Sequence, residues 1–87
     1  MPKIEIYTTA ICPYCVAAKN FLVDRGAAAY EEIRVDRDPQ RFAEMLARSG
    51  KRRTVPQIFI GGTHVGGYDD LVALDRAGGL APLLAGA

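Results

Sequence analysis

The order in which strand-like and helix-like segments follow one another is the feature that most restricts how this chain folds. Residues 3–7 alternate charged and apolar side chains, as a half-buried strand does, and residues 30–35 repeat that alternation. Between them, apolar residues recur at helical spacing from Pro13 to about Arg25, and Gly26 provides a stop. A strand, a helix and a strand in this order predict a parallel pair joined by a right-handed crossover.

A helix and a hairpin follow in the second half of the chain. Asp38 is suited to cap a helix and Pro39 to begin it, and this helix is expected to end near residues 49–50. Residues 57–60 form a short apolar run, and the glycines after it lead into residues 64–65. This pattern predicts two antiparallel strands joined by a tight turn.

The last segments complete an α/β pattern. Asp69 and Asp70 provide an acidic start for a third helix, and residues 80–84 form a short apolar segment that docks at the end. A chain of 87 residues has room for one domain, so we expect residues 1–87 to form a single domain. The expected architecture is a mixed four-stranded sheet, βαβ and then ββα, flanked by helices.

The charge balance excludes several classes of function. Eleven Lys and Arg against ten Asp and Glu give a formal net charge of +1, so no strong field attracts nucleic acid or an anionic membrane. The longest stretch without a formal charge, residues 54–68, is shorter than the ~20 residues that a membrane-spanning helix needs. Glu5 lies where a secretory signal would be apolar, so we expect a cytoplasmic protein.

The two cysteines, Cys12 and Cys15, are the strongest chemical signal in the sequence. They are too few for a disulfide scaffold and too close together to brace a fold, so we expect them to carry chemistry. Cys12 directly precedes Pro13, which places its sulfur at a helix N-terminus, where free backbone N–H groups favour an anion. Cys15 lies one turn further on the same face, roughly 5 to 6 Å away and within reach of a disulfide. We therefore expect Cys12 to be the thiolate and Cys15 to resolve its bond.

The helix end alone is too weak to hold a strongly acidic thiol. Lowering a thiol pKa from about 8.5 to about 5.5 takes roughly 4 kcal/mol, whereas a helix dipole typically supplies ~0.3 to 1 kcal/mol. Local N–H hydrogen bonds or a cation must therefore contribute. Lys19 lies two turns along the helix and is poorly placed. The better candidates are Lys51, Arg52 and Arg53, if the fold brings them near.

A cysteine pair can also belong to a zinc site or lie inert in a core. A closed zinc site needs four ligands, and beyond this pair the chain offers one histidine, His64, and scattered carboxylates. We therefore expect no metal, and a metal shared between two chains stays open as an alternative. Pro13 and the helix start around the sulfurs argue against an inert pair.

Three motifs occur together, in this order: Cys-Pro-Tyr-Cys at 12–15, Thr-Val-Pro-Gln-Ile-Phe-Ile at 54–60 and Gly-Gly-Tyr-Asp-Asp at 66–70. Together they resemble the glutaredoxin family, in particular its small bacterial dithiol type, and the likeness runs through essentially the whole chain. The resemblance implies a thioredoxin-like fold and a cytoplasmic thiol–disulfide oxidoreductase. It also implies glutathione as the co-substrate, with no tightly bound cofactor.

The resemblance also implies roles for residues near the cysteines. Cys12 matches the attacking cysteine of the family and Cys15 the resolving one. Tyr14 matches a tyrosine that shapes the groove beside the disulfide and contacts substrate. The alternative for Tyr14 is an ordinary exposed aromatic side chain.

The resemblance also implies roles for the residues that lead up to Pro56. Pro56 itself matches the family's cis-proline. Val55, with Thr54 before it, would offer backbone N–H and C=O groups to the cysteine of glutathione. Arg53 is the first choice to grip the glycyl carboxylate, and the other two bases of residues 51–53 stay open for that role. The alternatives are an ordinary proline at a strand start and a solvated basic loop.

A third implied group would bind the γ-glutamyl end of glutathione. Gly66 and Gly67 allow close backbone approach, and the N–H groups of Tyr68 and Asp69 at a helix start suit a carboxylate. The Asp69 side chain would take the ammonium. An ordinary turn with Asp69 or Asp70 as a helix cap is the alternative, and both uses are compatible.

Two residues depart from the usual family pattern. Thr9 stands three residues before Cys12, where many members carry Lys, and Tyr68 stands after the glycine pair, where many carry Cys or Ser. Both departures concern the affinity for glutathione rather than the fold. His64 is expected at the surface or sheet edge, with no part in the redox chemistry.

The expected reaction is the reduction of protein–glutathione mixed disulfides and of protein disulfides through Cys12 and Cys15, by a monomer. Ribonucleotide reductase is the customary protein substrate of the family, although nothing in these residues selects it. One alternative is a redox protein fed by thioredoxin reductase, against which the basic loop and Gly66–Gly67 argue. A second alternative is an iron–sulfur cluster held by two chains and two glutathiones through Cys12, which Pro13 disfavours.

Overall fold

The computed structural model describes residues 2–27 and 29–86, in which helices and strands follow one another in the predicted order. In chain order these elements are β1 (Ile4–Thr8), α1 (Pro13–Asp24), β2 (Glu31–Arg34), α2 (Pro39–Arg48), β3 (Gln57–Ile60), β4 (Thr63–Gly66), α3 (Tyr68–Arg76) and α4 (Leu80–Ala85). Their order and type confirm the sequence prediction. The observed ends lie within one or two residues of the predicted ones.

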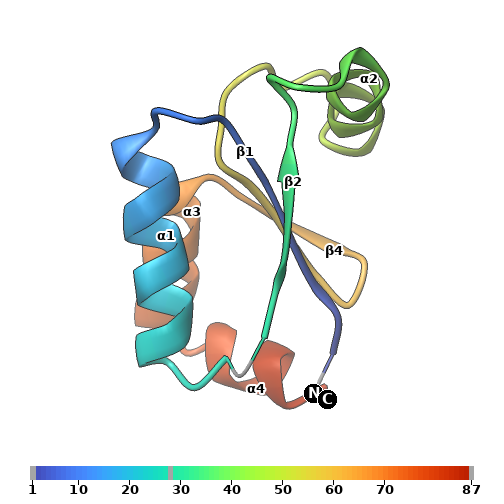
Figure 1. The fold of residues 1–87 in the computed structure, drawn as a ribbon. Helices are drawn as coiled ribbons and strands as arrows, with labels where there is room; N and C mark the ends of the chain where they lie inside the picture. Colours follow the sequence, from blue (N-terminus) through green and yellow to red (C-terminus); the bar gives the residue numbers. More distant parts are fainter. Residues whose placement is uncertain (1, 28, 87) are drawn as a thin grey trace.

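The strands form one mixed sheet in the order β2-β1-β3-β4. β1 pairs in parallel with β2 and antiparallel with β3, and β4 pairs antiparallel with β3. The helix α1 connects the two parallel strands, as predicted (Figure 1). The predicted mixed four-stranded α/β sheet is therefore confirmed.

Helices cover both faces of the sheet (Figure 1). One face packs against α1, α3 and α4, and the main apolar cluster lies between them. That cluster contains Ile4, Ile6, Ala18, Leu22, Ala27, Ile58, Ile60, Leu71, Leu80 and Leu84. The other face packs against α2 around a smaller cluster of Tyr7, Ile33, Val35, Met45 and Phe59. The cysteines at the start of α1 therefore lie on the side of the larger core.

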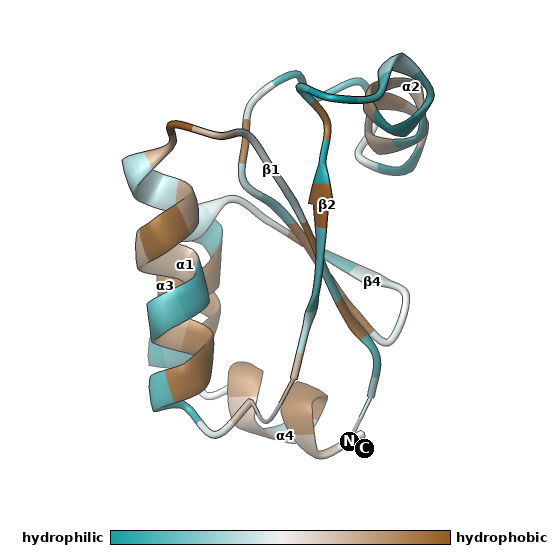
Figure 2. Cartoon of the chain, in the orientation of Figure 1, coloured by the Kyte–Doolittle hydropathy of each residue, from teal (hydrophilic) through white to brown (hydrophobic). Residues whose placement is uncertain are grey.

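The expectation of a half-buried first strand is wrong for the end of β1, where Tyr7 and Thr8 are both completely buried. The reason is tertiary, because α2 places Met45 in the same cluster as Tyr7 and covers the second face. At the edge of the sheet, the predicted alternation holds around the buried residues Ile33 and Val35, whereas Glu31 and Glu32 at the start of β2 are both exposed and hydrophilic (Figure 2).

A polar cluster helps to hold α2 against the sheet. Apolar packing of α2 is limited, because Met45 is the single residue of this helix that is buried. Two nitrogens of Arg48 donate to the two carboxylate oxygens of Glu5, each at 3.0 Å. Arg48 also donates to the Tyr7 hydroxyl at 2.8 Å and lies with its guanidinium carbon 4.0 Å from the centre of the Phe59 ring. The hydrogen bond from Arg48 lowers the pKa of Glu5 against the opposing effect of burial.

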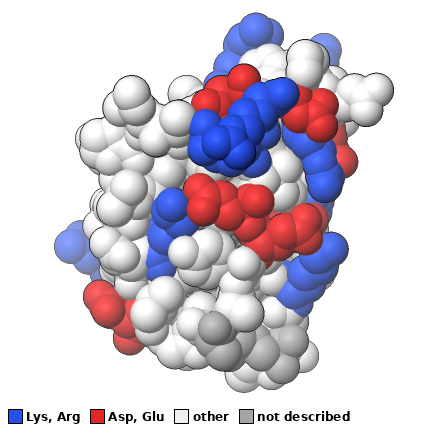
Figure 3. Space-filling model, in the orientation of Figure 1, with Lys and Arg blue, Asp and Glu red and all other residues white. Residues whose placement is uncertain are grey.

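The surface over β2 is a mixture of both charges (Figure 3). Lys19 on α1 pairs with Glu32 at 3.1 Å, and Arg34 pairs with Asp36 at 2.7 Å. Such exposed pairs cancel locally, in keeping with the small net charge. None of the helices in the described part of the chain is long and apolar enough to cross a membrane.

Candidate active site

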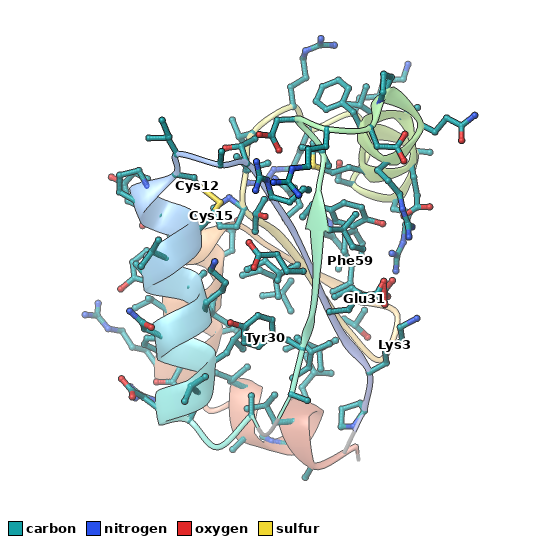
Figure 4. All side chains as sticks on the ribbon, in the orientation of Figure 1. Lys3, Cys12, Cys15, Tyr30, Glu31 and Phe59 are labelled. Atoms are coloured by element: carbon teal, nitrogen blue, oxygen red, sulfur yellow. A yellow bond between two sulfur atoms is a disulfide. The ribbon has the colours of Figure 1, made fainter. Side chains whose placement is uncertain are left out.

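Cys12 and Cys15 meet at the first turn of α1. Pro13 begins the helix, and Cys12 is its N-cap in an extended conformation, with φ −148° and ψ 97°. The Sγ atom of Cys12 accepts the backbone N–H of Cys15 at 3.1 Å, so it satisfies one of the free donors of the helix end. A disulfide joins the two sulfurs (Figure 4), and the Cα atoms are 5.2 Å apart. The predicted placement of the pair at a helix start is confirmed.

The two cysteines differ in accessibility. Cys15 is 2% exposed, whereas Cys12 is partly exposed at the end of the helix. A molecule that approaches from solvent therefore reaches Cys12 first. This difference is what an attacking and a resolving cysteine need.

The loop before Cys12 is held by Asp36, which directly follows the second predicted strand. The carboxylate of Asp36 accepts the backbone N–H of Ala10 at 3.1 Å and is itself bound by Arg34. The hydrogen bond from Arg34 lowers the pKa of Asp36 well below its usual range. Ile11, next to Cys12, is 92% exposed, so packing does not hold this loop. No local pattern could reveal this contact, because 26 residues separate its partners.

The Val55–Pro56 segment lies beside the cysteines in space, although it is 43 residues away from Cys12 in the sequence. The Val55–Pro56 peptide bond is cis, as the resemblance implied, and Pro56 is buried. The Sγ atom of Cys12 lies 3.8 Å from the carbonyl oxygen of Val55. The backbone expected to receive the glutathione cysteine therefore lies beside the sulfur expected to react with it.

A hollow of about 320 Å³, which we call the binding hollow, opens next to this contact. It is lined by Tyr14, Arg52, Thr54, Val55, Pro56, Gly67, Tyr68, Asp69 and Asp70. Most of the residues that the resemblance implied for glutathione therefore lie around one hollow, and Arg53 and Gly66 are not part of its lining. Arg52 and Asp70 join them.

The structure places Arg53, the first choice for the carboxylate, outside the lining of the binding hollow. The guanidinium of Arg53 lies over the ring of Phe42, 5.4 Å from its centre, and is not part of the lining. Arg52 is turned into the wall of the hollow instead, and the side chain of buried Ser49 bonds to both its backbone N–H and its carbonyl, at 3.2 Å each. Lys51, the third basic residue of the loop, has a φ of 70°.

Asp70 links the basic loop to the start of α3. Its Oδ2 atom accepts the backbone N–H of Gly67 at 2.8 Å and lies 3.1 Å from Nη1 of Arg52. The Gly67 hydrogen bond and, after it, the contact with Arg52 lower the pKa of Asp70. Gly66 has a φ of +110°, and a Cβ there would collide with the Asp70 carboxylate and the Arg52 guanidinium. The close approach expected of this glycine is therefore made to these two side chains.

The aromatic rings of Tyr14 and Tyr68 form another part of the wall of the binding hollow. Tyr14 is 62% exposed, and its ring centre lies 6.1 Å from that of Tyr68. Phe21 meets Tyr68 edge-on, with 6.2 Å between the ring centres. Tyr68, which departs from the usual family pattern, is therefore held between two other rings.

The remaining candidates lie away from the sulfurs. Lys19 is paired with Glu32, which agrees with its exclusion as the cation near Cys12. His64 lies on β4 at the edge of the sheet, as expected, where it is partly buried with its ring stacked on Phe59. Within residues 2–27 and 29–86 no three His, Cys, Asp or Glu side chains lie together as a metal site would require.

Comparison with known proteins agrees with this geometry. The glutaredoxin family model matches residues 4–65. Over 84 residues the chain is 56% identical to a glutaredoxin of Pseudomonas aeruginosa, covering 97% of this chain and 98% of that one. It is 51% identical over 84 residues to glutaredoxin 3 of Escherichia coli, covering 97% and 99%.

Solved structures show the same fold. The crystal structure of a buckwheat glutaredoxin–glutathione complex matches with a TM-score of 0.85 and 33% identity, over 97% of this chain and 77% of that one. The sheet and its helices therefore have the thioredoxin-like arrangement that the resemblance implied. With a family match over most of its length and a cysteine pair at the start of α1, this chain belongs to the glutaredoxin family of thiol–disulfide oxidoreductases.

Proposed function

We propose that this protein is a glutathione-dependent oxidoreductase that reduces protein–glutathione mixed disulfides and protein disulfides in the cytoplasm. The observation that carries the proposal is the position of the Cys12 sulfur. It caps α1 and lies 3.8 Å from the Val55 carbonyl at the edge of the binding hollow. A structural neighbour from buckwheat has been solved in complex with glutathione.

The first reaction needs Cys12 alone. Its thiolate attacks the glutathione sulfur of a protein–glutathione disulfide, and the protein leaves as a thiolate that takes up a proton. Cys12 then carries glutathione through a new disulfide. A second glutathione thiolate attacks the glutathione sulfur of that disulfide, which forms oxidised glutathione and restores the Cys12 thiolate.

The second reaction uses both cysteines. Cys12 attacks a protein disulfide and forms a mixed disulfide with one of its sulfurs. The thiolate of Cys15, one turn away, then attacks the Cys12 sulfur and releases the substrate thiol. This leaves the Cys12–Cys15 disulfide, which two glutathione molecules reduce as they become oxidised glutathione.

The binding hollow would supply partners for each end of glutathione. Thr54, Val55 and Pro56 would lie along its cysteine, with Val55 offering backbone groups as an extended pair. Arg52 would take the glycyl carboxylate, since an arginine fork matches a carboxylate in shape and charge.

The start of α3 would receive the γ-glutamyl end. Backbone N–H groups of Tyr68 and Asp69 point from a helix N-terminus, which favours a carboxylate. The exposed Asp69 side chain would take the ammonium, while Asp70 is already engaged with Gly67 and Arg52. Tyr14 would close the groove beside the sulfurs.

The test is mass spectrometry of the reduced protein after mixing with oxidised glutathione. The Cys15→Ser variant should gain the mass of one glutathione, and peptide mapping should locate it on Cys12. The unmodified protein should instead lose the mass of two hydrogen atoms as its own disulfide forms, while oxidised glutathione is reduced to two molecules of glutathione. Absence of the adduct in the variant would overturn the proposed use of glutathione.

A further inference from the structure

Gln57 is a completely buried polar side chain that the proposed reaction does not use. It lies on β3, directly after Pro56. Its amide nitrogen donates to the carbonyl oxygen of Thr54 at 3.0 Å and to the Thr54 hydroxyl at 3.3 Å. Its amide oxygen lies 2.7 Å from Nε2 of His64 on β4. A chain of hydrogen bonds therefore runs from β4 through β3 to the wall of the binding hollow.

The direction of this chain is determined by its end at Thr54. A carbonyl oxygen only accepts, so the amide NH₂ of Gln57 must face it. The amide oxygen of Gln57 must then face His64, which makes Nε2 of His64 the donor. Among the described residues, no buried side-chain nitrogen or oxygen lacks a partner, so each member of the chain is satisfied.

His64 is held in place for this contact by its ring. The imidazole stacks on Phe59, with ring centres 4.8 Å apart and planes inclined by 24°. Phe59 is itself 2% exposed and belongs to the cluster beneath α2. The imidazole that donates to Gln57 therefore rests on a buried residue of the core.

The peptide bond after Thr54 carries this constraint to Val55. The carbonyl of Thr54 and the N–H of Val55 belong to one planar peptide unit, so fixing one direction fixes the other. Thr54 is exposed, and its own packing does not determine that plane. Gln57 therefore sets the direction of the Val55 N–H, beside the carbonyl that lies 3.8 Å from Cys12.

We propose that Gln57 and His64 are positioning residues for the Thr54–Pro56 segment, and that they set how well this segment holds the glutathione half of a mixed disulfide. The inference rests on the proposed function, since it concerns the backbone expected to bind the glutathione cysteine. Neither side chain lines the binding hollow, so both act through Thr54. Loss of one such hydrogen bond changes affinity by about 2- to 10-fold.

The test compares His64→Phe with Thr63→Val. The first keeps an aromatic ring on Phe59 but removes the donor to Gln57, and the second changes an exposed residue of the same strand. With a peptide–glutathione disulfide as substrate, His64→Phe should raise KM about 3- to 10-fold and leave kcat within about 2-fold. Thr63→Val should change neither. An unchanged KM in His64→Phe would overturn the inference.

A second variant tests whether His64 acts through Gln57. In a Gln57→Leu background, His64→Phe should raise KM less than about 2-fold further, because the chain is already broken. An equal increase in both backgrounds would overturn the inference. The amide resonance of Val55 gives a readout that needs no turnover and no Gln57 variant. It should shift in His64→Phe and not in Thr63→Val, and an unshifted resonance would also overturn the inference.

The same measurements separate this inference from the proposed function. If the unmodified protein fails to turn over any glutathione mixed disulfide, the proposed function is wrong. The Val55 resonance then still reports whether His64 and Gln57 position the segment. If turnover is normal and the KM of His64→Phe is unchanged, only the positioning role is wrong.

Discussion

The guanidinium of Arg52 and the carboxylate of Asp70 meet at 3.1 Å beside the binding hollow, and so join the loop before Pro56 to the first turn of α3. Both side chains are nearly half exposed, at 43% and 47%, so the pair adds little to stability. Its effect is to hold one arginine in the wall. Arg52 is thereby oriented before any ligand arrives.

The two neighbouring arginines provide a matched pair of variants. Arg52→Met should raise the KM for a peptide–glutathione disulfide by roughly 3- to 10-fold, because a carboxylate partner is lost. Arg53→Met should change it less than about 2-fold, since Arg53 lies over Phe42. Steady-state kinetics at low ionic strength measures both. The opposite ranking would restore Arg53 as the carboxylate partner.

Replacing the buried cysteine should separate the two reactions. Cys15→Ser should retain the reduction of glutathione mixed disulfides, which needs only Cys12, and should abolish the reduction of protein disulfides. Assays with a glutathionylated peptide and with a disulfide-bonded protein distinguish these activities. Equal loss of both would contradict the assignment of Cys15 as the resolving residue.

The contact between Glu5 and Arg48 predicts how stability depends on pH. The pKa of Glu5 is lowered in the folded protein, so its contribution is present above its unfolded pKa of about 4.3 and is lost as pH falls through the lower folded value. Glu5→Gln should lower stability at pH 7 by about 1 kcal/mol, or Tm by about 4–8 °C, and should flatten the decline below about pH 4. Thermal unfolding at several pH values checks this. A parallel decline in both proteins would count against it.

Alanine variants of two glycines distinguish the cost of backbone strain from the cost of a steric collision. Gly66 and Gly62 both have positive φ, of +110° and +84°, but a Cβ at Gly62 would meet no atom within 4 Å. Gly62→Ala should therefore cost only about 1 kcal/mol of backbone strain. Gly66→Ala should cost more and should also raise KM for glutathione mixed disulfides, because it displaces Arg52 and Asp70. Denaturant unfolding and kinetics of the two variants test this, and equal effects would show that no collision occurs.

The periodicity of apolar residues and the end signals of the helices were sufficient to predict the order of elements. Asp38, Pro13 and Pro39 mark helix starts through chemistry that is local to a few residues, and the structure places helix starts there. Burial of both faces of β1 was not predictable in this way. It depends on where α2 packs, which a distant residue, Arg48, helps to decide.

In the site, too, the local motifs were predictable from the sequence and the conformation of a loop was not. The residues that the motifs supplied, such as Tyr14, Val55 and Tyr68, do surround one hollow, because each motif is a short segment with a defined conformation. The choice between Arg52 and Arg53 depended on how a loop turns. That turn involves Ser49 and a positive φ at Lys51, and neither is visible in a charge pattern.

The hydrogen bond from the Cys15 N–H to the Cys12 sulfur has a consequence for repeated use of the protein. A thiolate accepts such a bond more strongly than a disulfide sulfur does, so α1 keeps its first turn whether the pair holds two electrons or has given them up. The reduced and the oxidised protein therefore keep the same helix start at α1. Successive catalytic cycles then require only that sulfurs exchange partners, with no helix to rebuild in between.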